Sequence, residues 1–194
     1  MSTTFTVFAV CTGNICRSPA MERLLVQLFH DQPDIAVTSG GTYAHDGEDM
    51  QEPMKQRVAD YGADVDGFSA QQVTPAAIRS ADLILSATRV HIEDMAAEVP
   101  EARERMFTLP EFARLLQSMD RAGLDDAAGG DRSPAQTLAA LVPQLDHSRR
   151  SAGAATREDD VVDPYMLPES VYDTSFGQIR DSVEAMAQAL RLSE

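Results

Sequence analysis

The first 25 residues constrain the fold most, because they read as a strand, a loop and a helix in direct succession. Residues 5–10 form an apolar run that predicts a buried strand, and residues 19–25 begin a pattern typical of an amphipathic helix. A loop between a strand end and a helix start gathers backbone N–H groups that have no helical partner, and the positive end of the helix dipole adds to them. Residues 11–18 therefore predict an anion-binding site.

Two side chains in this loop carry chemistry. Cys11 stands at the first position of the loop, and Arg17 stands near its end. A thiol that faces such a site is pushed toward the thiolate, which is the nucleophilic form. A guanidinium fork can bind two oxygens of a phosphate at once. The spacing indicates a nucleophilic cysteine beside a bound oxyanion.

Strand and helix patterns alternate along the rest of the chain. Apolar runs predict strands at residues 4–10, 35–38, 82–87 and 106–109, with a turn at residues 39–42. Helical spacing of apolar residues predicts helices at residues 18–30, 54–61, 75–80, 91–99, 112–119, 134–141 and 176–190. This alternation predicts an α/β fold with a parallel sheet and helices on both faces. Ligands bind such sheets at the carboxyl ends of the strands, where the loop at 11–18 lies.

The segment from residue 121 to residue 160 differs from the rest. Residues 125–131 and 148–155 are rich in small and polar residues, which predicts mobile loops on either side of the short helix at 134–141. We interpret the segment as an excursion from the core of a single domain that spans residues 1–194, since this length fits one domain. The chain then returns to the core at residues 161–165.

Composition limits the partners. The formal net charge is −15, which argues against nucleic acid and against anionic membranes as partners. No apolar run is long enough to span a bilayer, and the first residues carry no basic region typical of a secretory signal. Two cysteines do not make a disulfide scaffold, so we expect a reducing cytoplasm. An anionic substrate would have to be attracted by the loop itself, because the overall charge repels it.

Residues 10–21 read Val-Cys-Thr-Gly-Asn-Ile-Cys-Arg-Ser-Pro-Ala-Met. This stretch closely resembles the phosphate loop of the low-molecular-weight protein tyrosine phosphatases. A second signature, Asp-Pro-Tyr at residues 163–165, resembles the family's general-acid motif, and weaker matches lie at residues 39–42 and 82–91. The resemblance covers the chain except the segment at 121–160, which is longer than is usual in the family.

The resemblance implies a four-stranded parallel sheet flanked by helices, with no metal and no cofactor. It implies hydrolysis of phosphotyrosine proteins or small aryl phosphates through a phosphocysteine intermediate, in a protein that we expect to be a monomer. Cys11 would be the nucleophile, Arg17 would hold the phosphoryl oxygens and Asp163 would be the general acid. The loop would bind phosphate through its backbone N–H groups, which belong to Thr12, Gly13, Asn14, Ile15, Cys16 and Arg17.

Four further residues receive supporting roles from the resemblance. Ser18 would donate a hydrogen bond to the Cys11 sulfur, and Asn14 would hold the strained loop, since asparagine tolerates a left-handed backbone. Ser39 would tie Asn14 in place. Tyr165 would form a wall against the substrate ring.

Several positions depart from the family pattern. His45 stands where many relatives carry a large aromatic residue, which predicts a weaker second wall. Glu48 and Asp49 make that rim acidic and should disfavour acidic phosphopeptides. Phe68 and Gln71 stand where relatives often have His and Arg, so we expect some support of the loop to be lost and turnover to be modest.

Other interpretations stay open. Cys16 is either a simple loop residue or a partner that traps oxidised Cys11 as a reversible disulfide. We expect His91 to be structural, and Tyr172 to be a surface or core residue. The chain could also be an arsenate reductase that uses an external thiol, since no cysteine follows Cys16. A non-catalytic phosphate-binding module is disfavoured, because nucleophile, arginine and acid are all present.

Overall fold

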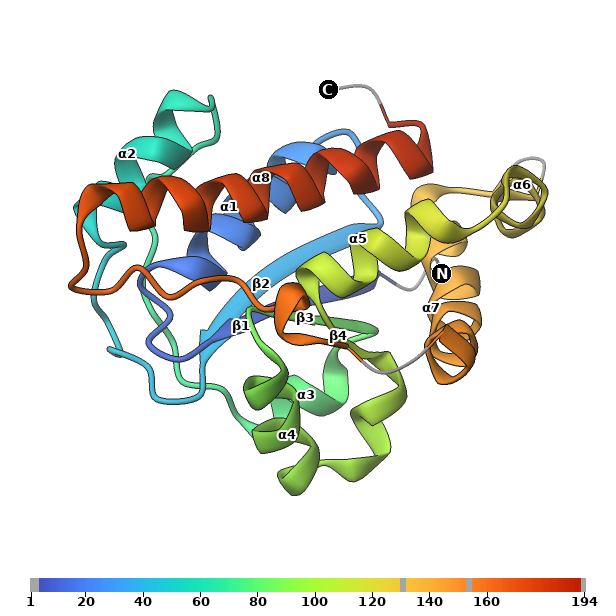
Figure 1. Ribbon diagram of the computed structural model, residues 1–194, viewed down its shortest axis with the longest axis horizontal. Helices are drawn as coiled ribbons and strands as arrows, with labels where there is room; N and C mark the ends of the chain where they lie inside the picture. Colours follow the sequence, from blue (N-terminus) through green and yellow to red (C-terminus); the bar gives the residue numbers. More distant parts are fainter. Residues whose placement is uncertain (1–3, 130–131, 153–154, 193–194) are drawn as a thin grey trace.

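The computed structural model describes residues 4–129, 132–152 and 155–192, and its centre is a sheet of four parallel strands (Figure 1). The strands are β1 (Phe5–Cys11), β2 (Ile35–Gly41), β3 (Leu83–Ser86) and β4 (Met106–Thr108). Their order across the sheet is β2-β1-β3-β4, with every neighbouring pair parallel. The predicted fold class, a single α/β domain with a four-stranded parallel sheet, is confirmed.

Helices cover both faces of the sheet (Figure 1). They are α1 (Arg17–Leu28), α2 (Glu52–Asp60), α3 (Pro75–Ser80), α4 (Arg89–Glu98), α5 (Leu109–Ser118), α6 (Arg121–Ala128), α7 (Pro134–Ala152) and α8 (Glu169–Leu190). Two short 3₁₀ helices, η1 (Pro100–Arg105) and η2 (Arg157–Asp159), complete the connections. Within the described residues, no helix is both long and apolar enough to cross a membrane.

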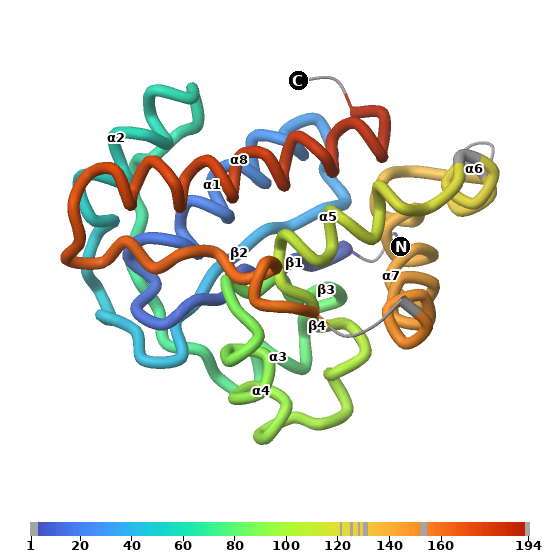
Figure 2. Tube along the Cα trace, viewed as in Figure 1, coloured from blue at the N-terminus to red at the C-terminus, as the bar shows by residue number. Residues whose placement is uncertain are grey.

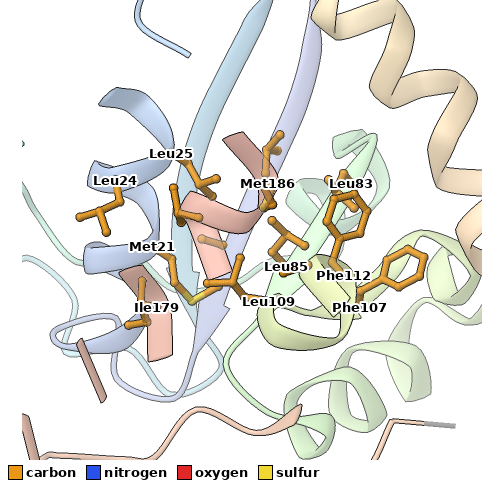
Figure 3. Close-up of a cluster of buried hydrophobic side chains, with 14 of the residues drawn as sticks. Met21, Leu24, Leu25, Leu83, Leu85, Phe107, Leu109, Phe112, Ile179 and Met186 are labelled. Carbon is orange, nitrogen blue, oxygen red and sulfur yellow. The ribbon is translucent and has the colours of Figure 1, made fainter. Parts of the chain in front are cut away.

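Alternation along the strands divides the buried side chains into two cores. On β1, Val7 and Ala9 point into a large core with α1, α5 and α8, whereas Phe8 and Val10 point into a smaller core with α3 and α4. Both sets are buried, which explains why the strand sequences are continuously apolar. Figure 3 shows part of the large core, where α1 and α8 meet β3, β4 and α5 through Met21, Leu24, Leu25, Leu83, Leu85, Phe107, Leu109, Phe112, Ile179 and Met186.

The turn predicted at residues 39–42 is wrong, because β2 continues to Gly41 and pairs with β1 as far as Cys11. The two glycines allow a close approach that other residues would block. A Cβ atom on Gly40 would lie 2.8 Å from the Phe8 ring, and one on Gly41 would collide with the Thr12 carbonyl oxygen. Glycine therefore lets β2 run tightly alongside the start of the loop at 11–18, where a turn signal alone suggested a chain reversal.

The loops predicted at residues 125–131 and 148–155 are also corrected. Helix α6 extends through residue 128 and α7 extends through residue 152, while residues 130–131 and 153–154 lie outside the described residues. Helix α7 is held by buried leucines that belong to the large core, namely Leu138, Leu141 and Leu145. It continues past them because Arg149 is itself buried, with its guanidinium 4.3 Å from the centre of the Phe107 ring and 2.5 Å from Asp146. The sequence predicted a loop here because the last turns of the helix are polar, although Arg149 in these turns is buried.

Leu141→Ala tests whether α7 belongs to the cooperative core. Leu141 is fully buried, so we expect the free energy of unfolding to fall by about 2–5 kcal/mol, as measured by urea denaturation. Gln144→Ala, on the exposed side of the same helix, is the matched control and should change stability by less than about 0.5 kcal/mol. Equal effects for the two variants would contradict this assignment.

Candidate active site

The loop between β1 and α1 lies at the carboxyl edge of the sheet, where β1 has β2 on one side and β3 on the other. This is the switch point at which parallel sheets bind ligands. Figure 2 shows three segments that meet there: the loop after β1, the chain after β2 and the chain that precedes α8. They enclose a pocket of about 240 Å³ that is lined by Cys11, Thr12, Gly13, Ile15, Cys16, Arg17, Tyr43, His45, Asp163 and Tyr165.

Asn14 fixes the loop from beneath the pocket. Its backbone is left-handed, with φ of 54°, and its side chain is fully buried. The side-chain amide donates to Ser18 Oγ at 2.9 Å and to Ser39 Oγ at 2.8 Å, and its oxygen accepts from the backbone N–H of Gln71 at 2.8 Å. The structure thus joins Asn14 to Ser39, as the resemblance implied, and it joins the same amide to Ser18, which was not expected. It also adds support from Gln71 through the backbone, which does not depend on that residue's side chain.

The network continues outward to a half-buried carboxylate. Ser39 Oγ donates to Glu22 Oε2 at 2.5 Å, so hydrogen bonds run from Asn14 through Ser39 to Glu22. Burial raises the pKa of Glu22, while the bond from Ser39 opposes that rise. Sequence reasoning missed Glu22, and no local signal distinguishes it, since it stands beside the charged Arg23 on the same helix turn.

The Ser18 hydroxyl lies beside the Cys11 thiol. Its oxygen lies 3.0 Å from Cys11 Sγ and 3.3 Å from the Gly40 carbonyl oxygen, and it accepts the bond from Asn14. A hydroxyl carries one hydrogen, and here that hydrogen can go only to the sulfur or to the carbonyl. A thiolate at Cys11 would be the stronger acceptor, so Ser18 is positioned to stabilise it.

Arg17 and Asp163 meet at the edge of the pocket. Arg17 Nη2 donates to Asp163 Oδ2 at 2.7 Å, and Nη1 lies 3.4 Å from the Val161 carbonyl oxygen. The Arg17 side chain is 5% exposed, whereas the Asp163 side chain is 51% exposed. A buried arginine fork beside a more accessible carboxyl group can hold an anion and exchange a proton with a group at the pocket mouth.

Aromatic rings form the walls. His45 packs edge-on against Tyr165, with ring centroids 5.6 Å apart, and also lies against Gly13, where a Cβ atom would come within 3.1 Å of the imidazole. Tyr43, which sequence reasoning missed, also lines the pocket. An aromatic residue two positions after the Gly-Gly pair of β2 was the available signal. The second wall therefore combines His45 with Tyr43, where the sequence predicted weakness from His45 alone.

His91 is structural, as the sequence predicted, and it also reaches the loop at 11–18. It is buried, its Nδ1 accepts from the Thr88 backbone N–H at 3.1 Å, and its Nε2 lies 3.0 Å from Thr12 Oγ1. An accepting Nδ1 puts the hydrogen of a neutral imidazole on Nε2, so His91 donates to Thr12. Thr12 Oγ1 also accepts from Arg17 Nη2 at 3.4 Å, which leaves its hydroxyl hydrogen free to point at a bound anion.

Cys16 lies in the pocket wall as a protonated thiol. Burial, reinforced by the negative charge that Cys11 can carry, raises the pKa of Cys16 to about 12. A hydrogen bond links it to Tyr172, which is buried near the start of α8. Such a thiol is a weak nucleophile, and a role for it in trapping oxidised Cys11 stays a prediction. Among the residues that the structure describes, no group of three or more His, Cys, Asp or Glu side chains could hold a metal ion.

The pKa of His91 generates a stability prediction. Burial, with the Arg17 charge second, lowers the pKa of His91 from 6.5 to about 4, against the opposite influence of Asp163 and Asp160. Between these pH values the unfolded chain binds a proton at His91 that the folded chain does not, so stability is lost as pH falls from about 6.5 to 4.

Urea unfolding of the wild type and of His91→Gln across this pH range tests the prediction. Glutamine can keep the bond to Thr12 but does not titrate, so the wild type should lose up to about 3 kcal/mol more than the variant. The comparison between the two proteins is needed because the raised pKa of Glu22 acts in the opposite direction. Parallel stability curves would contradict the buried neutral imidazole.

The amino-acid sequence of this chain is similar to those of a known family and of known proteins. The family described as "Low molecular weight phosphotyrosine protein phosphatase" matches residues 6–148. The protein-tyrosine-phosphatase Wzb of Escherichia coli K12 is 30% identical over 155 residues, which cover 80% of this chain and 97% of Wzb. Etp, a low molecular weight protein-tyrosine-phosphatase of the same strain, is 34% identical over 97 residues, which cover 50% of this chain and 64% of Etp.

Solved structures share the fold. The tyrosine phosphatase AmsI of Erwinia amylovora superposes with a TM-score of 0.67 at 20% identity, covering 99% of this chain and 95% of AmsI. The YwlE arginine phosphatase of Geobacillus stearothermophilus gives a TM-score of 0.68 at 22% identity, covering 96% of this chain and 93% of YwlE. The sequence matches extend this likeness from the fold to the family, and the chain belongs to the low molecular weight phosphotyrosine protein phosphatases.

Proposed function

We propose that this protein is a metal-independent phosphatase that hydrolyses phosphotyrosine-type monoesters through a phosphocysteine intermediate. One observation carries the proposal: the Cys11 thiol, the Arg17 guanidinium and the Asp163 carboxyl group line one pocket, with Arg17 and Asp163 joined at 2.7 Å. This set supplies a nucleophile, an oxyanion clamp and a proton donor without any further group.

The reaction would run in two displacements. In the first, the Cys11 thiolate attacks phosphorus while the bond to the phenolic oxygen breaks, and Asp163 gives its proton to that oxygen. In the second, Asp163 takes a proton from water, the water attacks phosphorus and the sulfur leaves as a thiolate, which Ser18 stabilises. Arg17 and the loop N–H groups bind the equatorial oxygens, and Thr12 can add its hydroxyl.

The walls of the pocket favour an aromatic leaving group. Tyr165, Tyr43 and His45 offer ring faces and edges, against which a phenyl ring packs well. We therefore propose phosphotyrosine proteins or small aryl phosphates as substrates, in agreement with the names of Wzb and Etp. We further propose that the protein acts as a monomer in the cytoplasm, where both free cysteines would stay reduced.

Two other reactions serve as comparison arms in the assay. Arsenate reduction would use Cys11 as the attacking group and an external thiol as the source of electrons, and no contact in the pocket favours it. Phosphoarginine hydrolysis enters because a structural neighbour is an arginine phosphatase. Aryl phosphate, phosphoarginine and arsenate with added thiol should be assayed side by side, and we expect turnover of the aryl phosphate to dominate.

Substitution of the nucleophile and the acid tests the mechanism with 4-nitrophenyl phosphate in the presence of a chelator. Cys11→Ser should abolish turnover, because a serine hydroxyl at this position is not activated. Asp163→Ala should lower kcat by about 10²–10⁴ with little change in KM, since proton transfer is lost while the phosphate clamp remains.

Asp94→Ala is the control for Asp163→Ala, because it removes an exposed carboxylate on α4 and should retain wild-type rates. Turnover by Cys11→Ser, or loss of activity on chelation, would rule out the proposed mechanism.

A further inference from the structure

Exposed apolar side chains are concentrated in the segments that border the pocket. Of the large hydrophobic residues that are exposed in the described part of the chain, all but Val26 lie in three segments beside the pocket. We call this set the apolar collar, and it consists of Tyr43, Val90, Val162, Tyr165, Met166 and Leu167. Exposed apolar residues are normally scattered singly, so their concentration at one edge marks a surface that binds something.

The three segments of the collar are tied to one another and to the loop at 11–17. The chain after β2 touches the segment before α8 through the ring contact of His45 with Tyr165. The start of α4 is held to the latter segment by Arg89 and Asp160, 3.0 Å apart. Tyr43 and Tyr165 belong both to the collar and to the pocket wall, so the collar continues the pocket onto the surface.

Met166 is the most unusual member. It is 83% exposed and has a left-handed backbone, with φ of 59°. It occupies the third position of a turn closed by the Leu167 N–H and the Pro164 carbonyl oxygen, 2.9 Å apart, where glycine or asparagine is favoured. A large apolar residue that is strained and still exposed points to a role outside the folding of the domain.

Charges around the collar are acidic. The bases nearby are already paired: Lys55 with Asp49, Arg57 with Asp173, and Arg89 with Asp160. On the rim and within the described residues, Asp46 has no ion-pair partner, and the Glu48 carboxylate pairs with His45 alone, at 3.3 Å. The surface around the collar therefore attracts basic groups and repels acidic ones.

We propose that the apolar collar binds the residues that flank the phosphotyrosine of a protein substrate, and selects apolar side chains beside it and basic ones further out. This inference rests on the proposed function and deepens it. The pocket holds the phosphorylated ring, so the chain on either side must leave across the collar. Apolar contact there compensates for the overall charge of −15, which repels the phosphate.

The experiment compares matched phosphotyrosine peptides whose flanks are apolar with basic ends, neutral and polar, or acidic. Binding is measured with the Cys11→Ser protein, so that the result does not depend on turnover, and hydrolysis of 4-nitrophenyl phosphate is measured separately. We expect the apolar, basic-ended peptide to bind at least about tenfold tighter than the acidic one. Hydrolysis of 4-nitrophenyl phosphate tests the proposed function, whereas the order of the peptide affinities tests the role of the collar. Either proposal can therefore be contradicted while the other stands.

Two substitutions address the collar directly. Met166→Asn combined with Leu167→Ser removes both apolar side chains, and asparagine suits the left-handed backbone at residue 166. The double variant should bind the apolar peptide about tenfold more weakly than the wild type does, whereas its affinity for the neutral peptide should change little. Val26→Ser, on the exposed side of α1, should match the wild type.

Three outcomes would overturn the proposal. The first is an unchanged peptide ranking in the collar variant, or acidic flanks that bind as tightly as apolar ones. The second is a dimer of the wild type that dissociates in the variant, because a second copy would then occupy the collar. The third is collar-dependent sedimentation with phosphatidylcholine vesicles, which would assign the surface to a membrane.

Discussion

The pocket depends on the buried amide of Asn14. Its left-handed backbone costs about 1–2 kcal/mol for most residues, and asparagine is among the few that adopt it readily. Three hydrogen bonds, to Ser18, to Ser39 and from Gln71, hold this conformation and satisfy the buried amide. The N–H groups of the loop can then face a common centre, while the helix that follows adds its dipole.

Hydrogen bonds from buried side chains also position two hydroxyl groups of the loop, those of Ser18 and Thr12. Ser18 accepts a bond from Asn14, and Thr12 accepts bonds from His91 and Arg17. On Thr12, the two donors leave the single hydroxyl hydrogen for a bound anion, whereas the Ser18 hydrogen can go to the Cys11 sulfur or to the Gly40 carbonyl oxygen. Fixed dipoles of this kind need no rearrangement when charge develops during a reaction, which is the main source of electrostatic catalysis.

A strongly acidic chain can still hold an anion, because local geometry outweighs the distant charges. The Arg17 guanidinium is buried beside the pocket, where its interactions are screened less than those of the carboxylates on the surface. The exposed carboxylates act at longer range, so they affect the approach of a partner more than they affect the binding of an anion in the loop. Apolar residues at the pocket mouth complement this arrangement, since they offer contact that does not depend on charge.

Sequence by itself determined the elements and the chemistry that lies within short stretches. Apolar periodicity set the strands and most helices, and the spacing of Cys11, Arg17 and Ser18 set the loop, because these are local consequences of backbone geometry. Tertiary structure decided what depends on contacts between distant segments. It extended β2 through its glycines, extended α7 around the buried Arg149, and brought His91 to Thr12 and Tyr43 to the pocket. These features depend on which side chains are buried together in the folded chain, and a local sequence pattern does not contain that information.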